Sequence, residues 1–244
     1  MGKQKPHISC GARVVAFVLD LLFPRFCYGC NGEGEFFCSS CRANIRFMPP
    51  ICVVCRKLVP ASGHVFAGRT CPGCRTKSAL YGFLSPFSYD DRPIKEMIHD
   101  LKYSHIRACA AVCADFFSAY ARIHGIVFPA NAVCIPIPLH KRRERVRGFN
   151  QAALFADLVA EQCGLLYEPV LIKNKNTPPQ TGLSREARRK NLEGVFGIRR
   201  SDAVRGKTVF LCDDVTTTGA TLEEAARALQ RAGAKKIWAV TIAH

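Results

Sequence analysis

The chain has 244 residues, 48% of them hydrophobic, so it is long enough for one full domain and a second, smaller one. Its formal net charge of +16 is high for this length and indicates a polyanionic partner, either a nucleic acid or a multiply phosphorylated small molecule. Fourteen cysteines without a visible secretory leader argue against a disulfide-rich secreted scaffold and favour a reducing cytoplasm with bound metal.

Residues 1–26 begin basic and polar and become apolar from Val14 onward. Asp20 and Pro24 interrupt the apolar run, which is too short for a membrane span of about 20 apolar residues. We therefore expect no integral membrane span and interpret this amphipathic segment as a helix packed on the rest of the protein. A peripheral contact with a membrane is the alternative.

Four C-x-x-C pairs follow between residues 27 and 74. Two thiolates separated by two residues can hold one tetrahedral ion from a tight turn, and two such pairs complete a closed four-sulfur site. Sequential pairing predicts two structural zinc ions, although a crossed pairing also fits the spacing. Residues 27–79 are thus expected to form a double zinc ribbon, whose eight ligands are Cys27, Cys30, Cys38, Cys41, Cys52, Cys55, Cys71 and Cys74.

From residue 80 onward, helical and extended patterns alternate along the chain. Helices are expected at 90–103, 107–123, 150–163 and 221–232, and extended segments at 81–89, 132–138, 167–172, 194–198, 207–212 and 236–242. This order predicts an α/β domain over residues 80–244, with a mainly parallel sheet flanked by helices.

The stretch 209–222 reads VFLCDDVTTTGATL and carries the clearest ligand signal. A buried strand runs into two carboxylates, and a tight polar loop then leads into a helix. Backbone N–H groups at a helix start and threonine hydroxyls favour a phosphate, whereas the carboxylates suit a sugar diol or a divalent cation. The ligand implied is a ribose 5-phosphate unit, and the candidate residues are Asp213, Asp214, Val215, Thr216, Thr217, Thr218, Gly219, Ala220 and Thr221.

Two basic segments complete the expected site. Residues 139–150 read LHKRRERVRGFN and should form a loop that faces the 213–219 loop, because the carboxyl ends of strands converge on one crevice. Residues 173–191 are long and polar, which indicates a mobile flap over a charged substrate, or else a flexible insertion. The candidate residues are Arg142, Arg143, Arg145 and Arg147 in the first segment, and Thr181, Arg185, Arg188 and Arg189 in the second.

The 209–222 stretch resembles the phosphoribosyl pyrophosphate (PRPP) motif of type I phosphoribosyltransferases. The order of cysteine pairs, an I-P-I-P strand, R-x-R-G-F-N-Q at 145–151 and DDVTTTGAT at 213–221 resembles the ComF family, including its ComFC and GntX types. The resemblance implies a double zinc ribbon joined to a phosphoribosyltransferase-like domain. It also implies a cytoplasmic protein linked to DNA uptake in natural transformation or to the use of DNA as a nutrient.

The same resemblance implies roles for individual residues. Asp213 and Asp214 would bind the ribose hydroxyls of PRPP, and the threonine-rich loop that follows would hold its 5-phosphate. The basic segment 139–150 stands where these enzymes bind pyrophosphate together with Mg²⁺, and the segment 173–191 stands where they carry a catalytic flap.

Two functions are compatible with these features. The first is a Mg²⁺-dependent phosphoribosyltransferase, a glycosyltransferase of pentosyl groups, with an unidentified acceptor. The alternative is a non-catalytic module that senses PRPP or a nucleotide while the ribbon and basic loops bind single-stranded DNA or a helicase-type partner. A zinc-stabilised scaffold with an inactive pocket is a third reading, which the intact 213–221 motif disfavours.

Overall fold

The computed structural model describes residues 24–62, 67–104, 106–175 and 194–244. The chain divides into two compact units, Met1–Ile45 and Arg46–His244. The first two cysteine pairs belong to the smaller unit, and the last two belong to the larger one. The sequence-based boundaries at 26/27 and 79/80 stay predictions, and the expected amphipathic segment lies almost wholly outside the described residues.

The described part of the smaller unit, residues 24–45, contains a tight turn and a short helix. An isolated bridge between Phe26 and Glu33 closes the turn that carries the first cysteine pair. Helix α2 (Ser39–Ala43) follows directly after Cys38, and Phe37 before it is buried. The described part of this unit buries little apolar surface, so a metal held by its cysteines would stabilise it.

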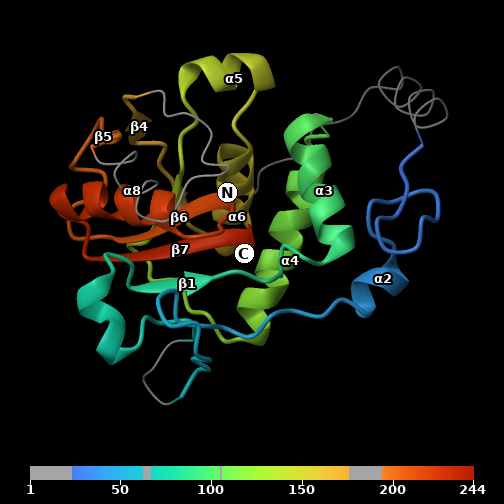
Figure 1. Ribbon diagram of the computed structural model, residues 1–244, viewed down its shortest axis with the longest axis horizontal. Helices are drawn as coiled ribbons and strands as arrows, with labels where there is room; N and C mark the ends of the chain where they lie inside the picture. The colour runs from blue at the N-terminus through green and yellow to red at the C-terminus, as the bar shows by residue number, and fades with distance from the viewer. Residues whose placement is uncertain (1–23, 63–66, 105, 176–193) are drawn as a thin grey trace, which may run out of the picture. The chain divides into compact units, whose positions relative to one another are not determined.

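The larger unit is organised by a five-stranded sheet in which every neighbouring pair is parallel, in the order β1-β7-β6-β2-β3 (Figure 1). The strands are β1 (Gly82–Leu84), β2 (Val133–Pro136), β3 (Leu166–Tyr167), β6 (Thr208–Val215) and β7 (Lys236–Ala243). The α/β architecture with a mainly parallel sheet is thus confirmed. The carboxyl ends of these strands share one edge, where the predicted site residues begin.

Helices pack on this sheet and on one another through apolar faces at helical spacing. Helix α8 (Ala220–Arg231) buries Leu222, Ala225 and Leu229 in one cluster with residues of β6 and β7. The other long helices are α3 (Arg92–Tyr103), α4 (Cys109–Ile123) and α6 (Gln151–Cys163). Among the described residues, no helix is both long and apolar enough to cross a membrane.

The basic segment after β2 was expected to be a loop, but it forms helix α5 (Lys141–Arg147), so that expectation was wrong. Its arginine-rich sequence has good helix propensity, and the His140 side chain caps the first turn by accepting the Arg142 N–H. Gly148 ends the helix in the left-handed conformation, with φ of 72°.

The expected strand at 167–172 is divided into two short strands. β3 ends at Tyr167 in the main sheet, whereas β4 (Leu171–Lys173) pairs with β5 (Phe196–Ile198) in a separate antiparallel sheet. Pro169 lies between them and has no N–H for a ladder hydrogen bond, which explains the break. Strand β6 also runs three residues further than expected, so it includes both aspartates.

Gly82 lies beside Trp238, its register partner on β7, and an added Cβ would lie 2.2 Å from the Trp238 Cζ3 atom. We expect Gly82→Ala to lower the free energy of unfolding by about 1–3 kcal/mol, because a close-packed ring leaves no room for the methyl group. Urea unfolding followed by fluorescence of the single tryptophan measures this change. Gly73→Ala is the matched control, since no atom lies within 4 Å of its added Cβ. Equal losses in both variants would contradict the steric explanation.

Candidate anion-binding site and metal centres

The candidate site begins with two adjacent carboxylates at the end of β6. Successive side chains of a strand point to opposite faces, so Asp213 and Asp214 leave the sheet on different sides. Asp214 pairs with Lys102 near the end of α3, with 3.0 Å between Nζ and Oδ1 and only 17% and 14% of the lysine and aspartate side chains exposed. Burial alone would lower the pKa of Lys102, but the attraction of Asp214 raises it. Lys102 therefore stays cationic beside Asp214.

Asp213 is in a different electrostatic state. Burial, and then the neighbouring charge of Asp214, raise its pKa to about 7. The Asp214 N–H, which donates to Asp213 Oδ1 at 2.9 Å, acts in the opposite direction, as do Lys102 and Lys173. At neutral pH this carboxyl group is thus balanced between its protonated and ionised forms, which makes it responsive to a cation or hydroxyl donor beside it.

The loop 216–219 turns from β6 into α8. Its first residue, Thr216, donates its N–H to the Ala243 carbonyl at 3.2 Å, and Gly219 has φ of 75°. Glu223 donates its N–H back to the Gly219 carbonyl, so the helix begins directly after this glycine. The amino end of a 12-residue helix therefore faces the loop, where its dipole favours an anion.

These elements line a cavity of about 250 Å³. Every residue predicted at 213–221 lines it except Asp214, which instead forms the ion pair with Lys102. The sequence interpretation missed Tyr89 and Lys102, which reach the cavity only through the tertiary fold. The lining residues are Tyr89, Lys102, Asp213, Val215, Thr216, Thr217, Thr218, Gly219, Ala220 and Thr221.

Lys173 at the end of β4 is a further basic group that the sequence interpretation did not assign to the site. Burial, and then the charge of Arg143 on α5, lower the pKa of Lys173, while Asp213 raises it. The charge of Lys173 is thus opposed by a second cation and favoured by the strand-end carboxylate. A bound polyanion would favour the charged form of this partly buried lysine.

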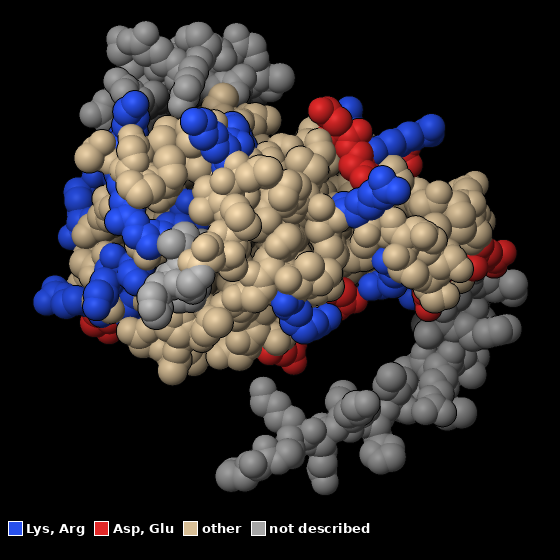
Figure 2. All heavy atoms as spheres, turned by 90° about the horizontal axis from the view of Figure 1, so that it is seen from below, with Lys and Arg blue, Asp and Glu red and all other residues tan. Residues whose placement is uncertain are grey.

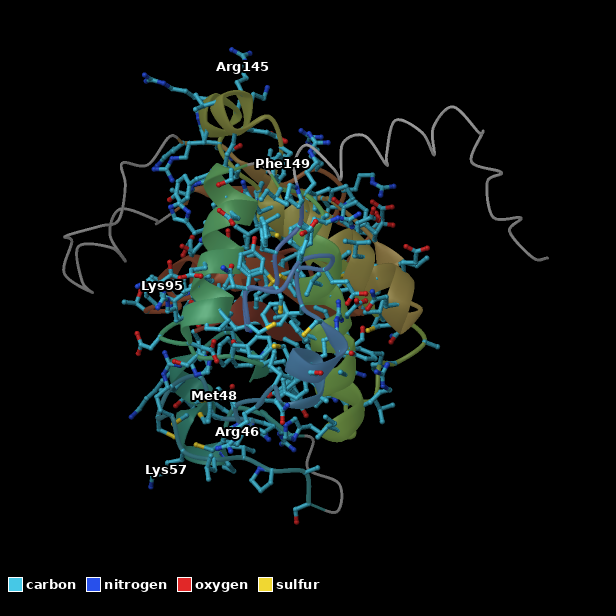
Figure 3. All side chains as sticks on the ribbon, turned by 90° about the vertical axis from the view of Figure 1, so that its right-hand side faces the viewer. Arg46, Met48, Lys57, Lys95, Arg145 and Phe149 are labelled. Atoms are coloured by element: carbon cyan, nitrogen blue, oxygen red, sulfur yellow. The ribbon has the colours of Figure 1, made fainter. Side chains whose placement is uncertain are left out.

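The four arginines of α5 divide into two pairs. Arg143 and Arg147 are partly buried, whereas Arg142 and Arg145 are exposed. Figure 3 shows Arg145 at the outer end of α5, pointing away from the rest of the protein. The Arg147 guanidinium lies 5.3 Å from the centroid of the Tyr103 ring. None of the four arginines lines the cavity: Arg147 packs on Tyr103, Arg143 acts electrostatically on Lys173, and Arg142 and Arg145 are in solvent. The predicted flap residues, Thr181, Arg185, Arg188 and Arg189, lie outside the described residues.

Two clusters of four cysteines can hold metal ions, and they follow the sequential pairing. Within each cluster the Sγ atoms all lie within 4.8 Å of one another, and the Cys30–Cys38 and Cys55–Cys71 distances are both 3.7 Å. Four sulfurs about 2.3 Å from a zinc ion would lie about 3.8 Å apart at the corners of a tetrahedron. The clusters therefore have the dimensions that zinc requires.

In each cluster, the environment of one cysteine favours its thiolate form. Burial alone would raise the pKa of Cys27 and Cys52, but backbone N–H groups that donate to their sulfurs lower both values to about 6. In the first cluster, the Cys38 N–H lies 3.4 Å from the Cys27 sulfur. Such N–H donors stabilise the ionised form that a metal binds.

Comparisons with known proteins agree with this arrangement. Residues 150–244 match the family described as phosphoribosyl transferase domain. Competence protein ComFC of Bacillus subtilis is 32% identical over 205 residues, which cover 82% of this chain and 80% of that protein. Competence protein F of Haemophilus influenzae is 27% identical, with 83% of this chain and 94% of that protein covered. DNA utilization protein YhgH of Salmonella typhi is 30% identical, with 82% and 86% covered.

The family predicted from the sequence is therefore confirmed by relatives that match along most of their own length. The cysteine clusters and the parallel sheet with its strand-end carboxylates agree with that assignment. The chain belongs to the ComF/YhgH family and carries a phosphoribosyl transferase domain.

Proposed function

We propose that the protein binds PRPP, or a closely related phosphoribosyl ligand, at the carboxyl end of β6, and that it acts in the uptake or use of DNA. The observation that carries the proposal is a cavity in which the Asp213 carboxylate and an anion-attracting loop lie together, inside the region that matches the phosphoribosyl transferase domain. The names of the relatives supply the DNA context, since two are named for competence and one for DNA utilization.

In this proposal the 5-phosphate lies in the 216–221 loop at the amino end of α8. The ribose hydroxyls donate to Asp213, which lines the cavity, while Asp214 holds Lys102 beside it. The diphosphate extends toward Lys173 and Arg143, so that each charged part of the ligand meets the opposite charge. The segment 173–191 is proposed to close over the ligand as a flap.

Mg²⁺ fits the donors at this place. It prefers carboxylate and phosphate oxygens and usually takes only one or two carboxylates from the protein. Asp213 is the carboxylate available to it, because Lys102 already partners Asp214. A bound Mg²⁺ would supply charge neutralisation on the diphosphate.

An enzyme with this site would transfer the phosphoribosyl group to an acceptor. The bond between C1 of the ribose and the diphosphate oxygen breaks, the diphosphate leaves with the bonding electrons, and C1 forms a bond to the acceptor. Positive charge develops on the ribose and negative charge on the diphosphate, so carboxylates and cations held in place stabilise the transition state. A sensing module would use the same residues to bind PRPP and release it unchanged.

We also propose that both cysteine clusters hold structural zinc. Sulfur occupies all four corners of each site, which leaves no open position for substrate. Because eight thiols must stay reduced to bind metal, the cytoplasm is the proposed location.

Single-stranded DNA is the second candidate ligand, and a group of cations around Tyr81 favours it. Arg69, Arg75 and Lys236 lie 5.3, 6.0 and 4.8 Å from the centroid of the Tyr81 ring. Figure 2 shows Lys and Arg gathered on the side where α8 and the start of β7 lie in Figure 1, with few acidic side chains among them. Cations of this kind bind phosphates along a nucleic acid backbone. The group lies at the amino ends of β1 and β7, opposite the proposed PRPP site.

Asp213→Asn tests the PRPP site and is expected to abolish Mg²⁺-dependent PRPP binding while stabilising the protein at pH 8. The Asp213 pKa is raised from 3.8 to about 7, so the native state gains stability from the bound proton below about pH 4 and loses it as pH rises through 7. Removing the charge should therefore add roughly 1–2 kcal/mol at pH 8, after allowance for partial exposure. Calorimetry with PRPP and urea unfolding at pH 5 and pH 8 measure the two effects.

The exposed Asp202 provides the control for this experiment. Asp202→Asn makes the same chemical change and should leave both PRPP binding and the pH dependence of unfolding as they are. Unaltered PRPP binding by Asp213→Asn would contradict the proposed site. Wild-type protein that does not bind PRPP would contradict the proposed function itself.

Reversing two charges beside Tyr81, in Arg75→Glu/Lys236→Glu, tests the second candidate. We expect affinity for single-stranded DNA to fall about tenfold and the slope of log affinity against log salt to fall by about 1.4, because two phosphate contacts are lost. Fluorescence anisotropy at several salt concentrations measures both. Lys57→Glu/Arg122→Glu makes the same charge change elsewhere and should have a smaller effect. Equal losses would indicate general attraction rather than a binding surface.

Cys74→Ser tests the zinc assignment. Sequential pairing predicts that the variant keeps the metal of the first cluster and loses that of the second, so zinc content should fall from about two ions per chain to about one. The melting temperature should fall as well, since structural zinc contributes folding free energy. Metal analysis and thermal unfolding measure these changes. Loss of both ions would contradict two independent sites.

A further inference from the structure

Arg56 belongs to the second cysteine cluster, but its side chain reaches the loop of the candidate phosphate site. It follows Cys55 directly in the chain, and its Nη2 atom donates to the Thr217 carbonyl at 3.3 Å. The two residues are 161 positions apart in the sequence and lie in the same compact unit. This contact joins the turn that carries one metal-binding cysteine pair to the middle of the anion loop.

The backbone at Arg56 is strained, which indicates that its side chain has a role. Its φ of 59° lies in the left-handed region, which is unfavourable for a residue with a Cβ. The first cluster has the same turn: Asn31 has φ of 61°, and both residues donate their N–H to the carbonyl of the first cysteine of their pair.

Asparagine tolerates this conformation several-fold better than most residues, whereas arginine has no such advantage. The two turns therefore share one geometry, but the second carries the less suitable residue at its strained position. Strain that persists at one position is an indication of function there. The Thr217 contact supplies that function, because it lies outside the turn itself.

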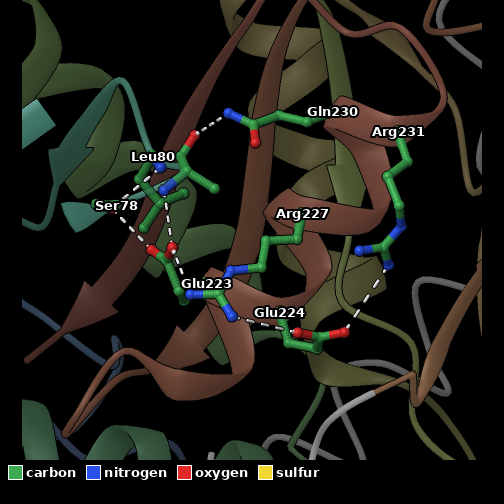
Figure 4. A network of polar contacts seen from close by, with 8 residues as sticks. Ser78, Leu80, Glu223, Glu224, Arg227, Gln230 and Arg231 are labelled. Carbon is green, nitrogen blue, oxygen red and sulfur yellow. Dashed lines mark hydrogen bonds and ion pairs between the residues drawn. The ribbon is translucent and has the colours of Figure 1, made fainter. Parts of the chain in front are cut away.

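A second contact ties the other half of this cluster to the same helix end. Cys74 lies in the short helix η1 (Pro72–Lys77), and the two residues after η1 both donate to Glu223 in the first turn of α8 (Figure 4). The Ser78 hydroxyl lies 2.7 Å from Glu223 Oε2, and the Ala79 N–H lies 2.7 Å from Oε1. The second cluster thus contacts the loop through Arg56 and the helix start through Glu223.

A cavity of about 530 Å³ lies beside the Ser78–Glu223 contact, and both residues line it. It is also bordered by Val53 and Val54 of the cysteine turn and by Thr218, Gly219 and Ala220 of the loop and helix start. Because this space separates part of the loop from the turn, polar contacts such as the one from Arg56 matter for the position of the loop.

We propose that Arg56 is a positioning residue for the bound phosphate, an inference that rests on the proposed PRPP site. Metal in the second cluster fixes the turn, the turn directs Arg56, and Arg56 holds the Thr217 carbonyl. Holding this carbonyl orients the loop so that its N–H groups face the anion, and the guanidinium adds a positive charge nearby. Metal in the second cluster and phosphate in the loop are then coupled, and each favours the other.

The decisive variant is Arg56→Asn, which places in the second turn the residue that the first turn already carries. Its affinity for PRPP with Mg²⁺ should be about tenfold weaker, because a charge-assisted hydrogen bond is lost. Its zinc content should be unchanged, and its melting temperature should stay the same or rise, because asparagine relieves the backbone strain. Arg56→Lys keeps a charged donor and should recover part of the affinity. Lys57→Asn, one residue further on, should bind PRPP as the wild type does.

Calorimetry with PRPP and Mg²⁺, metal analysis and thermal unfolding on the full chain give these three readouts. Weakened binding together with unchanged zinc and unreduced stability would support the proposal. Wild-type affinity in Arg56→Asn would overturn this inference and leave the proposed function standing. Loss of zinc or a lower melting temperature in that variant would overturn it by showing that Arg56 serves the turn itself. A wild type that fails to bind PRPP would overturn the proposed function and this inference with it.

Discussion

The electrostatics of the candidate site depend on two carboxylates on consecutive residues at the end of β6. A single lysine from α3 forms an ion pair with one of them. Lys102 pairs with Asp214, and Asp213 is left with a pKa of about 7. Two carboxylates without a counter-charge would normally repel a phosphorylated ligand. Here Lys102 compensates for only one of them, so Asp213, which lines the cavity, still needs a partner. A hydroxyl donor or a divalent cation supplies it. The parallel sheet matters here because it places the ends of its strands at the same edge as Asp213.

Two residues in or beside this site are unfavourable for the stability of the folded protein. Asp213 holds an unfavourable charge at neutral pH, and Arg56 holds an unfavourable backbone conformation. Each has a counterpart that is better suited to its position: Asp214 is paired with a lysine, and the matching turn of the first cluster carries Asn31, which tolerates the left-handed conformation. Residues that are unfavourable for folding persist where a ligand or a contact needs them, so such contrasts identify functional positions.

Local patterns were enough to predict the features that depend on neighbours in sequence. The apolar face of α3, the four cysteine pairs and the strand–loop–helix at 209–222 all follow from spacing, and the structure has each of them. The basic segment after β2 was misjudged because its charges suggested a loop, although a cap and a glycine stop make a helix of it. Lys102 and Arg56 could not have been predicted in this way, because a lysine in a helix and an arginine after a cysteine become site residues only through contacts made across the fold.

The two cysteine clusters have the same chemistry and nearly the same turns, yet they belong to different compact units. Among the described residues of the smaller unit, the buried apolar side chains are few, so a metal bound to the first cluster would contribute much of the stability there. In the larger unit, a parallel sheet already supplies a core, so folding alone does not explain a second metal. The contacts from Arg56 and from Ser78 lead from this cluster to the phosphate end of the proposed ligand. The expected double ribbon over residues 27–79 is thus divided: its second cysteine cluster lies in the same compact unit as the parallel sheet, and under the proposed function its contacts brace the loop that would bind the anion.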